Sequence, residues 1–102
     1  SYPVSKFHSL VVPKRCIKNY FELNAEEVLA CNDLIKKLKQ KIISEDDTVK
    51  GFNIGTNAGT AAGQSVFHCH IHVIPRREGD VKNPQGGVRS VIPSKQHYIR
   101  KK

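Results

Sequence analysis

The chain has 102 residues, of which 38% are hydrophobic and 25% are charged, and this composition is typical of one small globular domain. No run approaches the roughly 18 consecutive apolar residues that a membrane-spanning helix needs, so we expect neither a membrane protein nor a newly secreted one. The formal net charge is +8, and most of it lies in residues 51–102, where it favours a phosphate-bearing partner such as a nucleotide, a nucleic acid or an anionic lipid.

The first half of the chain predicts a strand followed by a long helix. Residues 7–12 are rich in β-branched and aromatic side chains and end at Pro13, as strands do. Asn24 and Glu27 have the spacing of a capping box, so we expect a helix to begin at residue 25. Apolar residues then recur at helical spacing to about residue 43, with lysines on the other side, and we expect the acidic residues 44–47 to form a loop.

The second half predicts two strands joined by a loop of small residues. Residues 51–57 are a candidate strand, and residues 58–63 have small side chains that let the backbone approach a ligand closely. A strand is expected over 67–74, ended by Pro75. Residues 76–102 are basic and rich in Gly, Pro and Lys, so we expect a loop-rich C-terminal segment.

Histidines alternate with apolar residues along the expected strand 67–74. The apolar positions are Phe67, Cys69, Ile71 and Val73, and the alternate positions are His68, His70 and His72. Side chains two residues apart in a strand share a face and lie about 6.6–6.8 Å from each other. The apolar face is therefore expected to pack beneath the helix, and the three imidazoles to form one row on the other face. Such a row indicates a site.

Three interpretations of this row are open. One is a solvated strand face that is rich in histidine by chance. Another is a metal site, but three histidines on a straight strand spread over about 13 Å, too far for one zinc ion. The third is a catalytic histidine for phosphoryl transfer, with residues 58–63, Gln64 and Ser65 offering donors to phosphate oxygens. The three cysteines are widely spaced and form no CxxC pair, which predicts reduced thiols in the cytoplasm and no bound metal.

The residues from Asn57 to Arg76 resemble the histidine triad family. The family signature is His-φ-His-φ-His-φ-φ, where φ is apolar, and residues 68–74 match it at every position. The resemblance extends to residues 8–15, which include an additional histidine, and to residues 20–23. Residues 83–93 are similar to a segment of bacterial members that resemble diadenosine polyphosphate hydrolases. The resemblance implies an α+β fold: a mainly antiparallel β-sheet with one long amphipathic helix packed on one face, in a single domain over residues 1–102.

The resemblance also implies a role for each site residue. The nucleophile that forms a nucleotidyl-histidine intermediate would be His70, held by the backbone carbonyl of His68. His72 would contact the bridging oxygen and assist the leaving group, and His8 would complete the histidine cluster. Substrate binding would fall to the loop and its neighbours: Asn57, Gly63, Gln64 and Ser65.

Hydrolysis of dinucleoside polyphosphates at the α-phosphate is the activity that the resemblance favours. The third histidine, His72, stands where the transferase branch has glutamine, and the chain has no tryptophan, unlike the tail of the phosphoramidase branch. The alternatives are a nucleoside phosphoramidate hydrolase and a non-catalytic nucleotide- or nucleic-acid-binding protein. Basic residues of the second half are candidates for neutralising a polyphosphate: Arg76, Arg77, Lys82, Arg89 and Lys95.

The expected partners are a purine nucleotide or a dinucleoside polyphosphate and a second copy of the chain, whereas a membrane partner is not expected and nucleic acid is disfavoured. The protein itself is expected to need no cofactor, although a divalent cation can accompany the substrate. In the family an upstream strand pair supplies apolar residues for the base and an aspartate for the ribose. The chain begins after the position where that aspartate is expected, so we predict ordered phosphate chemistry but weakened nucleoside affinity for residues 1–102 alone.

Overall fold

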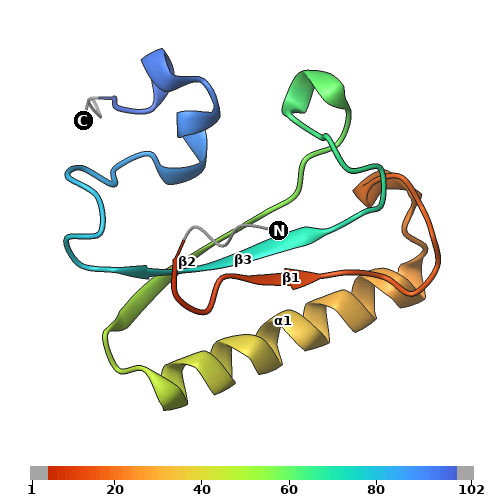
Figure 1. Ribbon diagram of the computed structural model, residues 1–102, viewed down its shortest axis with the longest axis horizontal. Helices are drawn as coiled ribbons and strands as arrows, with labels where there is room; N and C mark the ends of the chain where they lie inside the picture. Colours follow the sequence, from red (N-terminus) through yellow and green to blue (C-terminus); the bar gives the residue numbers. More distant parts are fainter. Residues whose placement is uncertain (1–4, 99–102) are drawn as a thin grey trace.

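The computed structural model describes residues 5–98, in which a three-stranded antiparallel sheet packs one face against a long helix (Figure 1). The strands are β1 (Ser9–Val11), β2 (Val49–Gly55) and β3 (Ile71–Arg77), and the helix is α1 (Ala25–Glu45). Their order in the sheet is β1-β3-β2, so the last strand in sequence lies in the centre. The α+β class with one helix on one face is confirmed. Residues 1–4 and 99–102, the latter being the last four residues of the basic segment 76–102, lie outside the described residues.

The capping box places the start of α1 as expected. The Asn24 side chain accepts a hydrogen bond from the Glu27 N–H, and the Glu27 carboxylate accepts one from the Asn24 N–H, both at 2.9 Å. The helix ends later than expected, because Ser44 and Glu45 are helical and Asp46 is the C-cap, whose N–H still bonds the Ile42 carbonyl. The expectation of a loop over 44–47 is therefore wrong for its first two residues.

The core lies between α1 and the sheet. It is formed by Val11, Cys31, Ile71 and Val73, with Ile35, Leu38 and Phe52 packed against it. Three of these residues come from α1 and belong to the apolar stripe seen in the sequence. The facing residues come from the sheet: Val11 from β1, Ile71 and Val73 from β3, and Phe52 from β2. The alternation of β3 then fixes which of its faces turns away from the helix.

The histidine strand differs from its expected bounds at both ends. The strand begins at Ile71 rather than at residue 67, and it continues through Pro75 to Arg77. The carbonyl of Pro75 accepts a hydrogen bond from the Ser5 hydroxyl, on the side of β3 where β1 has already ended. The N–H and C=O of one residue in an extended strand point to the same side, so the N–H that proline lacks would have had no strand partner there. Proline therefore does not end this strand.

The other two strands are also displaced from their expected ranges. β1 covers only Ser9–Val11 of the expected 7–12, because Phe7 has a φ of 69°, in the left-handed region that extended backbone excludes. β2 covers Val49–Gly55 rather than 51–57, and its register with β3 shifts between Val49 and Gly51. Short 3-10 turns lie at Tyr20–Glu22 and Thr60–Ala62.

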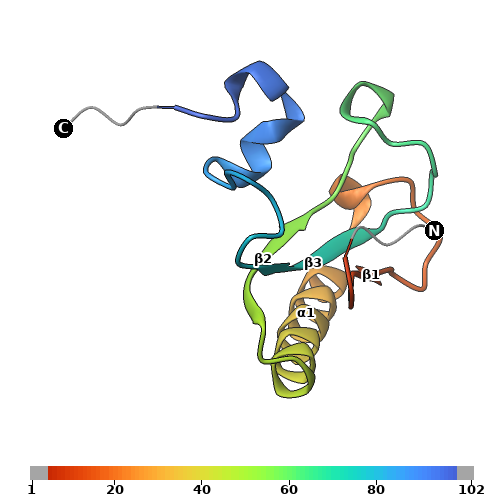
Figure 2. The same ribbon diagram turned by 60° about the vertical axis from the view of Figure 1, so that its left-hand side comes forward.

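The segment after β3 rises from one end of the sheet, on the side opposite α1 (Figure 2). We call residues 81–98 the C-terminal lobe. It contains two short 3-10 helices, Gly87–Val91 and Pro93–Lys95, so the expected loop-rich segment has local helical order. Within residues 5–98, no helix is both long enough and apolar enough to cross a membrane.

Candidate active site

The three histidines of the motif lie where the chain enters β3. His72 is within the strand, His70 comes directly before it, and His68 is part of a bend. All three are half-buried. The expected strand face is only partly present: Cys69, Ile71 and Val73 are buried, but Phe67 is 52% exposed because the chain bends at 66–68.

His70 is held by the backbone of its own motif. Its Nδ1 lies 2.8 Å from the carbonyl oxygen of His68. A carbonyl can only accept, so Nδ1 carries the proton and, in the neutral ring, Nε2 carries the lone pair. The backbone carbonyl of His70 accepts a hydrogen bond from the Thr56 hydroxyl at 2.7 Å, which ties the residue to the end of β2. The sequence contained no signal for the contribution of Thr56.

His72 forms a pair with His8. The His8 Nε2 and His72 Nδ1 atoms are 2.9 Å apart, and the two rings stack with centroids 5.1 Å apart. The ring of His70 meets His72 edge-on at 5.2 Å. Burial lowers the pKa of His72, and the neighbouring His8 and His70 lower it further. His72 is thus biased toward the neutral form, in which the pair shares one proton between Nε2 and Nδ1.

The ring of His68 has a different partner from the other three rings. Its Nε2 lies 3.3 Å from the carbonyl oxygen of Pro13, and the next N–H, that of Cys69, bonds the Ile17 carbonyl at 2.8 Å. The expectation of three imidazoles in one row on a strand is therefore wrong in its geometry. The structure brings His8, His70 and His72 into contact and ties His68 to the segment after β1.

Gln64 is a structural residue of the loop that precedes the histidines. It is 4% exposed, its side-chain oxygen accepts from the Gly59 N–H, and its amide group donates to the carbonyls of Lys18 and Val66. The oxygen and the amide group are thus engaged by the backbone, and a direct contact between this residue and phosphate stays a prediction. The neighbouring Ser65 is exposed.

The backbone of the loop depends on two glycines. Gly59 and Gly63 both have φ of 92°, a conformation that other residues rarely adopt. Asn57 is half-buried and lines the same cleft as His72, whereas Gly63 and Ser65 lie on the loop between β2 and the histidines.

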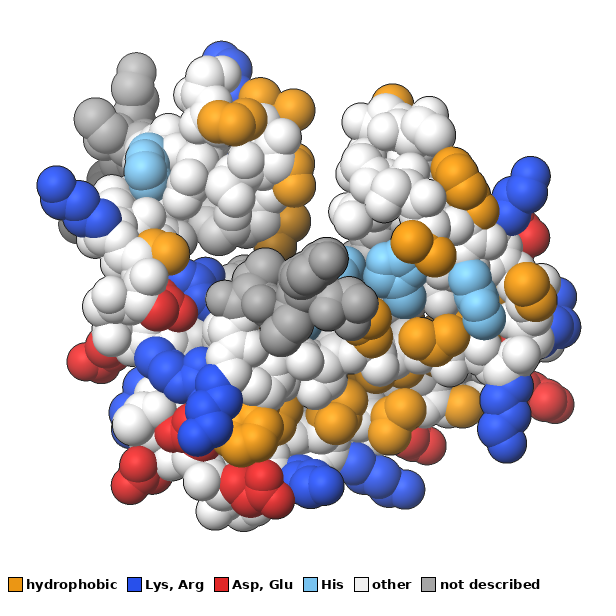
Figure 3. All heavy atoms as spheres, viewed as in Figure 1, with side chains coloured by type: hydrophobic (Ala, Val, Ile, Leu, Met, Phe, Trp, Pro, Cys, Tyr) orange, Lys and Arg blue, Asp and Glu red, His pale blue; other side chains and the backbone are white. Residues whose placement is uncertain are grey.

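A cleft of about 660 Å³ opens beside His72, on the face of the sheet opposite α1. Its floor contains Ile54 and Ile74, and the C-terminal lobe forms a wall with Val88 and Val91. Figure 3 shows the hollow between the C-terminal lobe and the loop that precedes the histidines. Hydrophobic side chains lie on the lobe side of this hollow, and histidine lies near its base. The sequence did not predict this cleft.

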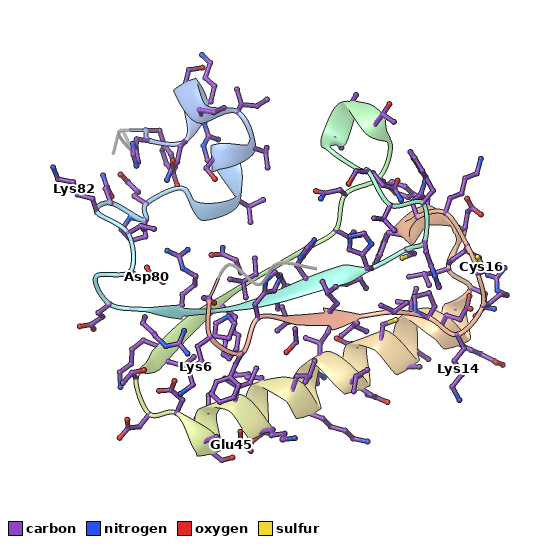
Figure 4. The ribbon with its side chains drawn as sticks, in the orientation of Figure 1. Lys6, Lys14, Cys16, Glu45, Asp80 and Lys82 are labelled. Atoms are coloured by element: carbon purple, nitrogen blue, oxygen red, sulfur yellow. The ribbon has the colours of Figure 1, made fainter. Side chains whose placement is uncertain are left out.

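The basic residues expected to neutralise polyphosphate lie at three different places. Arg76 and Lys82 line the cleft, but the Arg76 guanidinium is paired with Asp80 at 2.7 Å and also donates to the Asn53 side chain. Arg77 is paired with Asp46 on the other side of the strand end. Arg89 and Lys95 lie within the lobe, where the Arg89 guanidinium donates a hydrogen bond to the backbone carbonyl of Lys95. Figure 4 shows Asp80 and Lys82 on the segment after β3, far from Lys14 and Cys16 at the other end of the molecule.

Metal-binding side chains are not clustered in the part of the chain that the structure describes. Among residues 5–98, no group of three or more His, Cys, Asp or Glu side chains is arranged to hold a metal ion. Cys16, Cys31 and Cys69 are free thiols, and burial raises the pKa of both Cys31 and Cys69.

Comparisons with known proteins agree with this arrangement. The model of the HIT domain matches residues 1–79. A bis(5'-nucleosyl)-tetraphosphatase of Schizosaccharomyces pombe is 33% identical over 78 residues, which are 76% of this chain and 42% of that protein. An adenylylsulfatase of Arabidopsis thaliana is 37% identical over 78 residues, which are 76% of this chain and 39% of that protein. The crystal structure of a hypothetical histidine triad nucleotide-binding protein from Sulfolobus tokodaii has a TM-score of 0.68 at 40% identity, covering 78% of this chain and 52% of that one.

The chain spans about half the length of the curated relatives it matches. The family match covers residues 1–79, which extend to just beyond β3 and include the contacting His8, His70 and His72 as well as His68. The chain therefore belongs to the HIT-domain family, whose name abbreviates the histidine triad.

Proposed function

We propose that this chain carries the catalytic centre of a nucleotide hydrolase that cleaves dinucleoside polyphosphates at the α-phosphate. The observation that carries the proposal is the 2.8 Å contact between His70 Nδ1 and the His68 carbonyl. It holds one nitrogen of the ring in the protonated state and leaves the other as a nucleophile. The family and the relative named as a tetraphosphatase support the substrate class.

The first step is attack by His70 Nε2 on the α-phosphorus. The nitrogen–phosphorus bond forms as the bond from phosphorus to the bridging oxygen breaks, and that oxygen leaves with the electron pair. The His72 ring, whose centroid is 5.2 Å from that of His70, is near enough to donate a hydrogen bond to the departing oxygen. For this His72 needs a proton on Nε2, and in the neutral ring His8 then donates its Nε2–H to His72 Nδ1.

In the second step water attacks the phosphorus of the nucleotidyl-histidine. The phosphorus–nitrogen bond breaks, its electron pair returns to His70 Nε2, and the proton of the water is released. The His8–His72 pair is suited to receive that proton, because the neutral His72 ring carries a lone pair on Nε2 when the shared proton lies on its Nδ1. Position and preformed donors would supply most of the acceleration, as in other phosphoryl transfers.

The phosphate would be held by the loop before the histidines. Ser65 offers an exposed hydroxyl and Asn57 an amide that lines the cleft, while Gln64 keeps the loop in shape from beneath. A divalent cation, where one takes part, would arrive bound to the polyphosphate. Removal of divalent cations with a chelator should then slow hydrolysis of a polyphosphate more than that of a substrate with a single phosphate.

The test is incubation of the protein with diadenosine tetraphosphate, with AMP as the measured product. We expect AMP release, a nucleotidyl adduct on His70 after acid-free quenching and mass spectrometry, and loss of both in His70→Ala. A non-catalytic nucleotide-binding protein would bind the substrate without forming AMP. His97→Ala, in the C-terminal lobe, is a matched control and should release AMP like the parent.

A second candidate is hydrolysis of an adenylyl compound with a small leaving group. It is favoured by the relative named as an adenylylsulfatase. An adenosine phosphoramidate assayed beside diadenosine tetraphosphate distinguishes the two: the ratio of their kcat/KM values identifies the preferred leaving group.

We also infer a cytoplasmic homodimer. Free thiols at Cys31 and Cys69 fit a reducing compartment. Leu29, Leu34 and Ile43 of α1 are 44–64% exposed, and such apolar residues on one helix fit a contact between two copies. Light scattering after size exclusion measures the mass, and a monomer at micromolar concentration would contradict the dimer.

A further inference from the structure

The turn that carries His8 is one that its own sequence does not favour. Residues 5–8, which we call the His8 turn, are closed by a hydrogen bond of 3.1 Å from the His8 N–H to the Ser5 carbonyl. The third residue of the turn, Phe7, has a φ of 69°. Turns with a positive φ at this position ordinarily have glycine or asparagine there, because a bulky side chain makes the conformation costly. Contacts with other parts of the chain must therefore hold this turn in its shape.

The strand after the turn is too short to fix the position of His8 by itself. β1 has three residues, and its register with β3 begins at Ser9, which lies opposite Val73. His8 lies just before this ladder, yet its Nε2 is 2.9 Å from the Nδ1 of His72. The position of the His8 imidazole is therefore set from the side of the turn as well as from the strand.

The last residues of β3 anchor the His8 turn. The Ser5 hydroxyl donates to the Pro75 carbonyl at 3.1 Å, and the Arg77 Nη2 donates to the Lys6 carbonyl, also at 3.1 Å. Both anchors follow His72 on the same strand. One strand thus carries His72 and the two groups that hold the turn of its partner.

Arg77 is itself held by the residues between α1 and β2. Its Nη2 donates to the Asp46 carboxylate at 2.9 Å, and its Nε donates to the Thr48 hydroxyl at 3.2 Å. The side chains of this ion pair are mostly buried, with 20% of Arg77 and 13% of Asp46 exposed. The nitrogen Nη2 has two hydrogens, so one reaches the carboxylate while the other reaches the Lys6 carbonyl. The carboxylate therefore aims the guanidinium at the His8 turn.

The guanidinium of Arg77 is directed away from the cleft beside His72. Neighbouring residues of a strand point to opposite faces. Accordingly, Arg76 lines the cleft, whereas Arg77 is not among the described residues that line it. Its contacts with the turn and with Asp46 favour a role in positioning.

We propose that Arg77 is a positioning residue for the histidine cluster: aimed by Asp46, it holds the His8 turn and so keeps the His8 imidazole on His72. The inference rests on the proposed hydrolase activity and deepens it. In that activity the His8–His72 pair donates to the leaving oxygen and then receives the proton of the attacking water. Arg77 contributes to both steps through His8, without a contact to the substrate.

The first test asks whether Arg77 acts through His8. Arg77→Met removes the guanidinium and keeps an unbranched side chain. We expect NMR titration of the ring protons to show a raised pKa of His72, because His8 lowers that pKa and stacks on the ring. The change should be at least about half of the change that His8→Asn causes. In the His8→Asn background, Arg77→Met should cause no further change, since the group through which it acts is already absent.

A second variant separates positioning from a direct effect of charge. Loss of the Arg77 cation leaves the Asp46 carboxylate unpaired, and a nearby negative charge would by itself raise the pKa of His72. Asp46→Asn removes that negative charge, so a direct effect would lower the pKa. Positioning predicts the opposite, because Asp46→Asn weakens the aim of Arg77 and releases His8. The pKa of His72 should therefore rise in both variants, and Asp46→Asn decides the question if Arg77→Met does not fold.

The other charged groups around His72 are the same in every variant. The ring of His70 meets that of His72 edge-on. Three charged residues line the cleft together with His72: Arg76, Asp80 and Lys82. Asp80 accepts from the backbone N–H of Arg77, and Arg77→Met keeps this bond. A change in the pKa of His72 therefore reports on His8.

Arg15→Met is the matched control. The Arg15 Nη2 donates to the Glu27 carboxylate and to the Glu22 carbonyl, both at 2.8 Å, which repeats the pattern at the His8 turn. Figure 4 shows its neighbour Lys14 at the end of the molecule opposite to Lys6. Arg15→Met should therefore leave the titration of the histidine pair and kcat at the values of the parent.

Kinetics distinguish positioning from a contact with phosphate. Arg77→Met should lower kcat for diadenosine tetraphosphate about fivefold, a small part of the roughly 100-fold or more that a positioned proton donor contributes. KM should stay within about twofold, because Arg77 does not line the cleft. A raised KM with an unchanged pKa of His72 would show that Arg77 binds the polyphosphate, and the positioning role would be wrong.

The titration decides the inference separately from the activity. If the parent forms no AMP, the hydrolase proposal fails, and the pKa of His72 still shows whether Arg77 holds His8. An unchanged pKa in Arg77→Met, a lowered one in Asp46→Asn, or a full effect of Arg77→Met in the His8→Asn background each overturns the positioning role.

Discussion

Replacing Gln64 with leucine tests whether this residue holds the loop or contacts the substrate. The side chain is 4% exposed and makes three hydrogen bonds, with Gly59, Lys18 and Val66. Leucine has a similar size but makes none of them, so one backbone N–H and two carbonyls lose their partners in a buried site. At about 1 kcal/mol net for each bond, Gln64→Leu should lower the free energy of unfolding by about 3 kcal/mol.

Urea denaturation followed by far-UV circular dichroism measures that loss. Gln40→Leu is the control, because Gln40 is exposed on α1. Since the loop positions Ser65, the activity of Gln64→Leu should also fall. A variant with the stability of Gln40→Leu but a raised KM would show that Gln64 contacts the substrate, and our interpretation of its hydrogen bonds would be refuted.

Three further predictions concern charges and caps. His8→Asn should raise the pKa of His72, because His8 lowers it and helps to bury it; NMR titration of the ring protons measures the change, and an unchanged or lower value would contradict the pairing. Asn24→Ala should shift the urea midpoint by the equivalent of about 1 kcal/mol through loss of the helix cap, and an unchanged midpoint would show that the capping box contributes nothing. Asp46→Asn removes a carboxylate whose pKa is held well below its usual range by Thr48 and Arg77. The wild type should therefore have the higher Tm at pH 7, and the difference in Tm between the two proteins should decrease as the pH falls below about 4. A difference in Tm that does not depend on pH would contradict this.

The pKa of His72 has its own consequence for stability. Because it is lowered in the folded protein, the unfolded chain takes up a proton first as the pH falls below about 6.5. This histidine therefore favours the folded state above that pH and progressively less below it. The effect has the same sign as that of Asp46 but begins at a higher pH, so the two can be separated in a series of melts.

The features that the sequence predicted well depend on contacts between near neighbours. The capping box joins residues three apart, and the His70 Nδ1 bond to the His68 carbonyl joins residues two apart. The apolar stripe of α1 follows from helical periodicity alone, and its Cys31 and Ile42 are buried as expected. The class of the fold was implied by the resemblance to the histidine triad family, whose signature residues 68–74 match at every position.

The features that were missed depend on contacts between distant parts of the chain. Pro75 stays within its strand because β1 ends before reaching it, and no local rule contains that fact. Gln64 donates to the carbonyl of Lys18, 46 residues away. Its neighbours in the sequence give no sign of this bond, and for that reason the sequence alone predicts a ligand of phosphate. The wall of the cleft requires Gly86 to approach Gln96 and the whole lobe to return over the sheet.

The difference between local and distant contacts also separates the orientation of His70 from the shape of the cleft. The proposed nucleophile, His70, is oriented by the backbone carbonyl of His68, two residues before it, so its orientation depends on a local contact. The position of His72 depends on His8, 64 residues away, and the cleft beside it depends on a lobe that lies beyond the end of the family match. Substitutions in that lobe can change the shape of the cleft without moving His70.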